Sequence, residues 1–201
     1  MKSSERTITY SGNYIAITRN ELIENVKLQM KESRFKHVLR VEKTALNLAE
    51  KNQVKLEKAS IAALTHDYAK EFNDEKMIKM IKEENLGSNM IPFGNNICHG
   101  PCGAYIVRKE LGVTDEEILD AIRNHTTGAP KMSLLEQIIY VADYIEENRA
   151  FPGVKEARKL AENHLSDAVA YEAKHTLSYL IESNKLVFPK AIDTYNAWAA
   201  K

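Results

Sequence analysis

The residues of this 201-residue sequence best suited to metal chemistry are four histidines and two aspartates. In chain order they are His37, His66, Asp67, His99, His125 and Asp143. Each histidine lies at or near the end of an expected helix, or in a loop beside one. Helical proteins build metal sites from side chains that converge from several helices. Imidazole and carboxylate ligands suit iron, manganese or zinc, so the set predicts a metal site. Taken singly, each histidine is equally compatible with a surface or structural role.

The adjacent pair His66–Asp67 follows the apolar stretch 61–64 and precedes Lys70. Neighbouring side chains on a helix diverge by about 100°. The pair can therefore share one site only if the helix ends there and the backbone turns. Asp67 has two oxygens and could then bridge two metal ions. The alternative is a helix end that simply meets solvent.

Asp143 interrupts an almost wholly apolar stretch, I-I-Y-V-A-D-Y-I, and is expected to face the interior. A buried carboxylate requires a cation or several hydrogen-bond donors. A metal ion would meet that requirement, as would a helix cap or an arginine partner. The remaining histidines, His164 and His175, lie among charged residues and are expected at the surface.

Apolar residues recur with helical periodicity almost throughout, and eight glycines and five prolines interrupt the chain. Capping boxes at Thr18, Thr114 and Ser133 are expected to open three helices. Further helices are expected over 35–50, 57–66, 74–85, 101–111, 153–163 and 166–183, with a loop from Gly87 through Gly100. These elements predict an all-α fold with a single domain over 18–201. Residues 1–17 are predicted to form an N-terminal extension, and their few β-prone residues are compatible with an extended arm.

Charge and composition restrict the partners. Lysine plus arginine and aspartate plus glutamate each number 28, so no nucleic-acid partner is expected. The start of the chain lacks a secretory signal, and no apolar run approaches the roughly 20 residues that cross a bilayer. We therefore expect a soluble, cytoplasmic protein with no membrane partner. Cys98 and Cys102 are expected to be buried thiols rather than zinc ligands.

The order His…His-Asp…His…His…Asp resembles the HD-domain metallophosphohydrolase superfamily. Local motifs are similar to the YqeK family: R-F-K-H at 34–37, the run 66–70, H-G at 99–100, R-N-H-T-T-G at 123–128 and A-D-Y-I-E at 142–146. Cys102 and Glu147 depart from the residues expected there. The resemblance implies an all-α HD-type helical bundle and an iron centre of one or two ions, with manganese, zinc or another divalent metal as alternatives. It also implies symmetrical cleavage of diadenosine tetraphosphate into two ADP.

The resemblance further implies residue roles. A first metal would be held by His37, His66, Asp67 and Asp143, while His99 and His125 would hold a second metal or contact phosphate. The implied catalytic residues are Asp67, His99, His125 and Lys70. The implied nucleotide- and phosphate-binding residues are Lys70, His99, His125, Thr126, Asp143, Arg149, Phe188 and Pro189.

Two other functions remain open from the sequence. One is an HD phosphohydrolase that acts on a mononucleotide or a guanosine alarmone. The other is a nucleotide-binding sensor without catalytic activity. For the favoured function, the expected partners are a dinucleoside polyphosphate substrate and its ADP product. The oligomeric state stays open, with a homodimer as one option.

Overall fold

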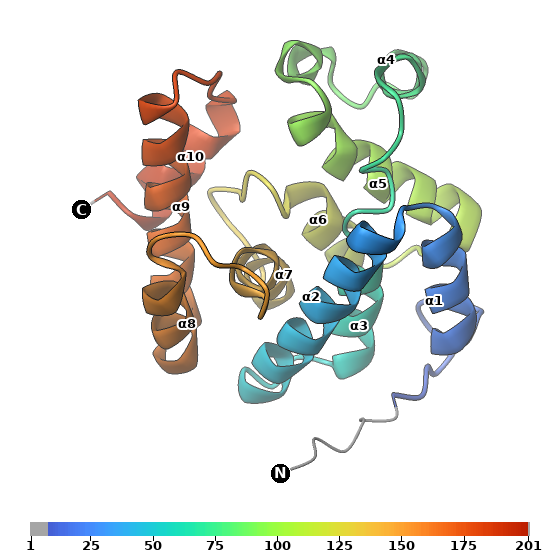
Figure 1. The fold of residues 1–201 in the computed structure, drawn as a ribbon. Coiled ribbons are helices and arrows are strands. Elements are labelled where there is room, and N and C mark those ends of the chain that lie inside the picture. The colour runs from blue at the N-terminus through green and yellow to red at the C-terminus, as the bar shows by residue number, and fades with distance from the viewer. Residues whose placement is uncertain (1–7, 201) are drawn as a thin grey trace.

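The computed structural model describes residues 8–200, and these residues contain helices but no strand (Figure 1). The helices are α1 (Arg19–Leu28), α2 (Glu32–Lys51), α3 (Leu56–Thr65), α4 (Asp74–Glu83), the 3-10 helix η1 (Ser88–Phe93), α5 (Asn95–Leu111), α6 (Glu116–Asn124), α7 (Leu134–Ile145), α8 (Val154–Asn163), α9 (Leu165–Glu182) and α10 (Pro189–Trp198). The predicted all-α fold is therefore confirmed.

Local sequence explains where several helices begin. Thr18 and Glu21 form a capping box at α1, as Ser133 and Glu136 do at α7, and both were predicted. The sequence analysis predicted the N-cap of α6 at Thr114, which is one residue too early. Its N-cap is Asp115, whose side chain accepts a hydrogen bond from the backbone of Ile118. A carboxylate at this position caps the first turn better than the preceding threonine would.

The expected loop through Gly100 was wrong, because α5 already begins at Asn95. Pro101 was expected to mark the helix start but lies inside α5. Proline lacks an N–H and removes one intrahelical hydrogen bond. The rest of α5 packs against α4 and α6, and this packing stabilises the turn that precedes the proline. As a result, His99 sits on a helix rather than in a loop.

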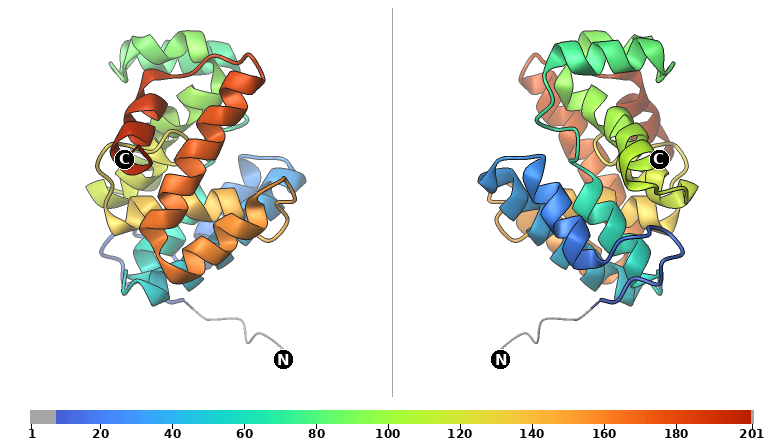
Figure 2. Two further views of the ribbon diagram at one scale, coloured as in Figure 1. Left: turned by 90° about the vertical axis from the view of Figure 1, so that its left-hand side faces the viewer. Right: turned by 90° about the vertical axis from the view of Figure 1, so that its right-hand side faces the viewer.

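The core lies among α2, α3, α6 and α7, which pack against one another in the middle of the molecule (Figure 1). α5 covers α6 on one side. α8, α9 and α10 form an outer layer, in which α9 packs against α7. The left panel of Figure 2 shows α8 and α9 across the face of this layer. The ends of the central helices meet at one place, which holds most of the predicted site.

The described part of the N-terminal extension, residues 8–17, is irregular and bent rather than a strand. It packs onto the protein. Ile15 is buried, the Tyr10 hydroxyl lies 2.8 Å from Ser60 Oγ, and the Ser11 backbone donates to Glu57 at 2.8 Å. The prediction for residues 1–7 lies outside the described residues.

Other expectations about exposure are confirmed. Cys98 and Cys102 are buried, free thiols. His164 and His175 are exposed, and His175 stacks on the ring of Tyr171. Among the helices that the structure describes, none combines the length and the apolar character that a bilayer crossing requires.

Candidate metal centre

Asp67 lies at the centre of a cluster of imidazole rings. Helix α3 ends at Thr65, so the backbone turns at His66–Asp67 as predicted. Asp67 Oδ1 lies 3.2 Å from His99 Nε2 and 3.7 Å from His125 Nε2. Asp67 Oδ2 lies 3.4 Å from His66 Nε2 and 3.8 Å from His37 Nε2. The side chain of Asp67 thus contacts rings from four helix ends with both of its oxygens.

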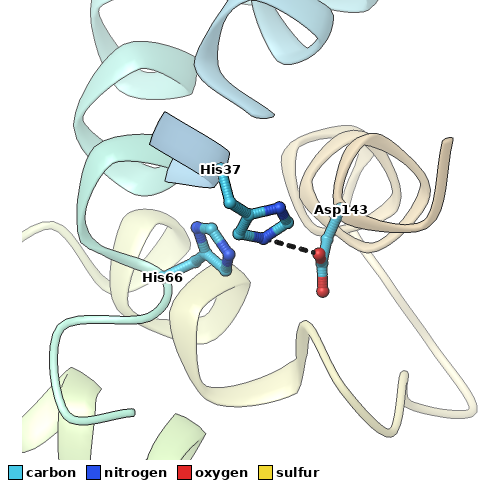
Figure 3. A group of neighbouring side chains, drawn as sticks. All are labelled: His37, His66 and Asp143. Atoms are coloured by element: carbon cyan, nitrogen blue, oxygen red, sulfur yellow. Dashed lines mark ion pairs between the residues drawn. The ribbon is translucent and has the colours of Figure 1, made fainter. Parts of the chain in front are cut away.

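Asp143 completes the cluster from α7 (Figure 3). Its Oδ1 lies 3.1 Å from His37 Nε2. Two groups of side chains could each hold a metal ion, and both groups include His66. Within each group the potential ligand atoms lie within 4.8 Å of one another. One contains His37, His66 and Asp143, and the other contains His66, Asp67 and His125. Asp143 also pairs with Arg149, so the arginine partner left open by the sequence is present as well. The structure thus brings the six predicted ligands together.

Hydrogen bonds at Nδ1 orient all four rings. The acceptors are the carbonyl oxygens of Ala63 for His66 (2.7 Å), Asn95 for His99 (2.8 Å) and Ile122 for His125 (2.8 Å), and Glu146 Oε1 for His37 (3.3 Å). A carbonyl oxygen only accepts, so Nδ1 carries a proton in the three rings that face carbonyls, and their Nε2 atoms face the cluster. Metal-binding histidines are commonly oriented in this way.

The donor set fits a divalent metal ion. Nε2 of His37 and Nε2 of His66 are buried and make no well-formed hydrogen bond, which is rare for buried polar atoms, although carboxylate oxygens lie 3.1 Å and 3.4 Å away. Nε2 of His99 and Nε2 of His125 face each other at 2.9 Å. With Nδ1 protonated in both rings, this close approach requires a cation, a proton or a metal ion, beside the two Nε2 atoms. These atoms therefore have the direction and the chemistry of metal ligands.

Three cationic side chains surround the cluster. Arg34 Nη1 lies 2.9 Å from Asp67 Oδ2, and Arg149 Nη2 lies 2.6 Å from Asp143 Oδ1. Lys70 Nζ lies 3.4 Å from His99 Nδ1. Burial lowers the pKa of Lys70. The site therefore combines the buried carboxylate of Asp67 and the partly buried carboxylate of Asp143 with a rim of positive charge suited to phosphate.

Both carboxylates favour the ionised form that a metal ion requires. Burial opposes ionisation of Asp67, but the positive charge that His66 can carry and hydrogen bonds from protonated His125 and His99 outweigh it and hold the pKa of Asp67 well below its usual range. Burial lowers the pKa of His66, but the charge of Asp67 outweighs it and raises that pKa, so a metal ion would displace a proton from His66. Burial also opposes ionisation of Asp143, yet the contacts with His37, His66 and Arg149 lower its pKa. For His99, burial lowers the pKa to about 4.

A cavity of about 450 Å³ adjoins the cluster at Thr126. The Thr126 hydroxyl lies 3.0 Å from His125 Nε2 and also lines the cavity. The wall includes Phe188 and the cations Arg108, Arg123 and Lys190. The Phe188 ring packs on Phe93, with centroids 5.0 Å apart. Pro189, expected beside Phe188 in the site, is the first residue of α10 and is not part of the cavity wall.

The sequence analysis gave no role to Arg34 or Glu146, although both lie in quoted motifs. Arg34 contacts Asp67, and Glu146 contacts His37. Each lies three residues from a predicted ligand, His37 and Asp143 respectively, which places neighbours on one helix face. That spacing indicates only that both residues lie near a predicted ligand, and not which groups they contact.

An all-helical fold that collects histidines and aspartates from the ends of five helical segments is the arrangement of HD-domain proteins, and the model of the HD domain family matches residues 34–148. The symmetrical bis(5'-nucleosyl)-tetraphosphatase of Bacillus subtilis (strain 168) is 48% identical over 180 residues, covering 90% of this chain and 97% of that protein. The protein of the same name from Halalkalibacterium halodurans is 41% identical over 180 residues, covering 90% and 96%.

A solved structure supports the same relationship. The crystal structure of a predicted HD superfamily hydrolase involved in NAD metabolism from Clostridium acetobutylicum matches with a TM-score of 0.85 and 38% identity, covering 89% of this chain and 95% of that one. The chain belongs to the HD-domain family and, within it, to the family of the symmetrical bis(5'-nucleosyl)-tetraphosphatases.

Proposed function

We propose that this chain is a metal-dependent hydrolase that cleaves diadenosine tetraphosphate symmetrically into two ADP. The observation that carries the proposal is the buried cluster of imidazole rings around Asp67, in which two Nε2 atoms make no well-formed hydrogen bond, in a chain whose relatives bear the name of this activity. The cations at its rim suit a substrate with four linked phosphates.

The proposed metal is iron. His37, His66, Asp67 and Asp143 would hold one ion, and His99 and His125 would hold a second through Asp67 or contact phosphate directly. A divalent ion bound here lowers the pKa of a water ligand, in favourable sites to about 7, and polarises a phosphoryl oxygen. Backbone carbonyls accept from Nδ1 of His66 and Nδ1 of His125, which leaves Nε2 of each ring facing the cluster, and both carboxylates are ionised, so these side chains can bind a cation.

The side chains around the cluster would bind the phosphate chain. Lys70 supplies a point charge beside His99, and Arg149 supplies a planar pair of donors that matches phosphate oxygens. The Thr126 hydroxyl stands where the cluster joins the cavity. One nucleoside half would enter that cavity and pack against Phe188, while Pro189 fixes the start of α10 behind this ring.

Product analysis tests the proposal. The protein is purified without oxygen, loaded with ferrous iron and incubated with diadenosine tetraphosphate, and the products are separated by anion exchange. ADP as the sole product is expected. AMP plus ATP would overturn the symmetrical cut, and an intact substrate would overturn the hydrolase itself. Asp67→Ala, prepared in parallel, excludes a contaminating activity.

Parallel incubations address the other functions open from the sequence. A mononucleotide and a guanosine tetraphosphate are supplied under the same conditions. Faster turnover of either compound than of diadenosine tetraphosphate would contradict the proposed substrate. Binding of ADP without turnover of any substrate, with iron or manganese, would instead indicate a sensor.

A further inference from the structure

Glu146 lies directly after α7 as its C-cap residue and is only 2% exposed. Its Oε1 lies 3.3 Å from His37 Nδ1. Its Oε2 accepts hydrogen bonds from Arg40 Nε and from the backbone N–H of Asn148, each at 2.7 Å. One buried carboxylate therefore accepts from three donors, two on α2 and one in the turn that follows α7.

The same residue holds the segment that carries Arg149. Arg149 Nε lies 3.8 Å from Glu146 Oε1, and the Arg149 backbone donates to the Glu146 carbonyl at 2.9 Å. Arg158 Nη2 donates to the same carbonyl at 2.8 Å. Glu146 thus stands between the ring of His37 and the guanidinium that pairs with Asp143.

His37 differs from the other three rings of the cluster. The Nδ1 atoms of His66, His99 and His125 face backbone carbonyls, whereas Nδ1 of His37 faces a carboxylate. A carboxylate acceptor fixes the Nδ1–H tautomer and makes Nε2 a stronger electron donor than a neutral acceptor does. The Nε2 atom so prepared is buried, makes no well-formed hydrogen bond and lies 3.1 Å from Oδ1 of Asp143, the other ligand candidate.

We propose that Glu146 is a positioning residue of the metal centre. It holds His37 as the Nδ1–H tautomer with Nε2 directed at the metal, so that it acts on metal binding through His37. This role rests on the proposed function, since it takes His37 to be a metal ligand. If Glu146 has this role, the metal affinity depends on Glu146 although Glu146 does not contact the metal.

Glu146→Gln is the direct test, because glutamine has nearly the same shape but only one acceptor oxygen. His37, Arg40 and the Asn148 backbone then compete for that oxygen. Dissociation constants for cobalt(II) and manganese(II) are measured by titration calorimetry, and cobalt absorption reports the ligand geometry. We expect metal binding weaker by about 10- to 100-fold and a changed cobalt spectrum.

Glu42→Gln is the matched control. Glu42 is also 2% exposed on a helix and also pairs with an arginine, Arg19, but its other hydrogen bond goes to Ser60 rather than to the cluster. This variant should keep the wild-type metal affinity. Circular dichroism and urea unfolding of both variants separate a local effect from general loss of structure.

A double-mutant cycle separates positioning from a purely structural role. In a His37→Ala background, Glu146→Gln should change the remaining metal affinity by less than about twofold, since the two residues act through one ligand. An equal loss with and without His37, or unchanged binding by Glu146→Gln in the native background, would overturn the positioning role alone. Wild-type protein that binds no divalent metal would instead overturn the proposed function, and the role of Glu146 with it.

Discussion

Gly100 lies in a close contact between α5 and α6 next to the cluster. A Cβ atom added at Gly100 would lie 2.9 Å from the carbonyl oxygen of Arg123 and 3.2 Å from that of Ile122. Both are backbone atoms of α6, so no side-chain rotation relieves the contact. Because His99 and His125 flank this contact, Gly100→Ala should separate the two rings and destabilise the fold.

Gly103, which lies on the same helix, is the control position for this substitution. A Cβ there would lie 3.6 Å from Ile122 Cγ2 and 3.7 Å or more from backbone atoms, which is ordinary contact. Both substitutions gain about 0.5–1 kcal/mol of helix stability. Overpacking at Gly100 costs about 1–3 kcal/mol. Gly100→Ala should therefore be less stable than Gly103→Ala by about 1–3 kcal/mol, which corresponds to roughly 2–12 °C in Tm for a chain of this length.

Thermal and urea unfolding of the two metal-free variants measure this difference. Metal titration then shows whether the ring separation matters, and we expect Gly100→Ala to bind divalent metal more weakly than Gly103→Ala. Equal stability of the two variants would refute the argument that the backbone contact between α5 and α6 limits their approach.

Three further outcomes are expected. Asp67→Ala should abolish metal binding and turnover while circular dichroism shows the wild-type helix content; activity near that of wild type would contradict the central place of Asp67. Lys70→Ala should lower kcat/KM by roughly 10- to 100-fold with metal content unchanged, as elemental analysis would show. Burial, reinforced by the charge of Asp143, raises the pKa of Glu172 well above its usual range, and its Oε2 has no hydrogen-bond partner. The folded state therefore holds this proton more tightly than the unfolded chain does. Stability from Glu172 is fully present below the unfolded pKa of about 4.3 and is lost as pH rises through the window up to the folded pKa. The stability advantage of Glu172→Gln over wild type should grow across that window in urea unfolding at several pH values, and an advantage independent of pH would contradict this.

Much of the site was predictable because its parts are local. An apolar helix that ends in His66–Asp67 must turn there for the two side chains to share a site, and α3 does end at this point. Asp143 was recognisable as a charge within an apolar helix. In both cases a few consecutive residues contain all the information that the prediction needs.

Features that depend on packing between distant segments were not predictable. Pro101 suggested a helix start, but contacts with α4 and α6 extend α5 back to Asn95 and put His99 on its first turns. Glu146 and Arg34 are ordinary charges in sequence, and their roles depend on which rings and carboxylates the fold places beside them. The cavity beside Thr126 is built from segments on either side of the core.

The C-terminal helix is fastened to the turn that follows His125. The Thr194 hydroxyl donates to the Thr127 carbonyl at 2.9 Å, and Trp198 Nε1 donates to the Ala129 carbonyl at 2.9 Å. Trp198 is the sole tryptophan of the sequence. A change in its fluorescence on addition of a ligand would therefore report, without any label, a movement of the turn that follows His125.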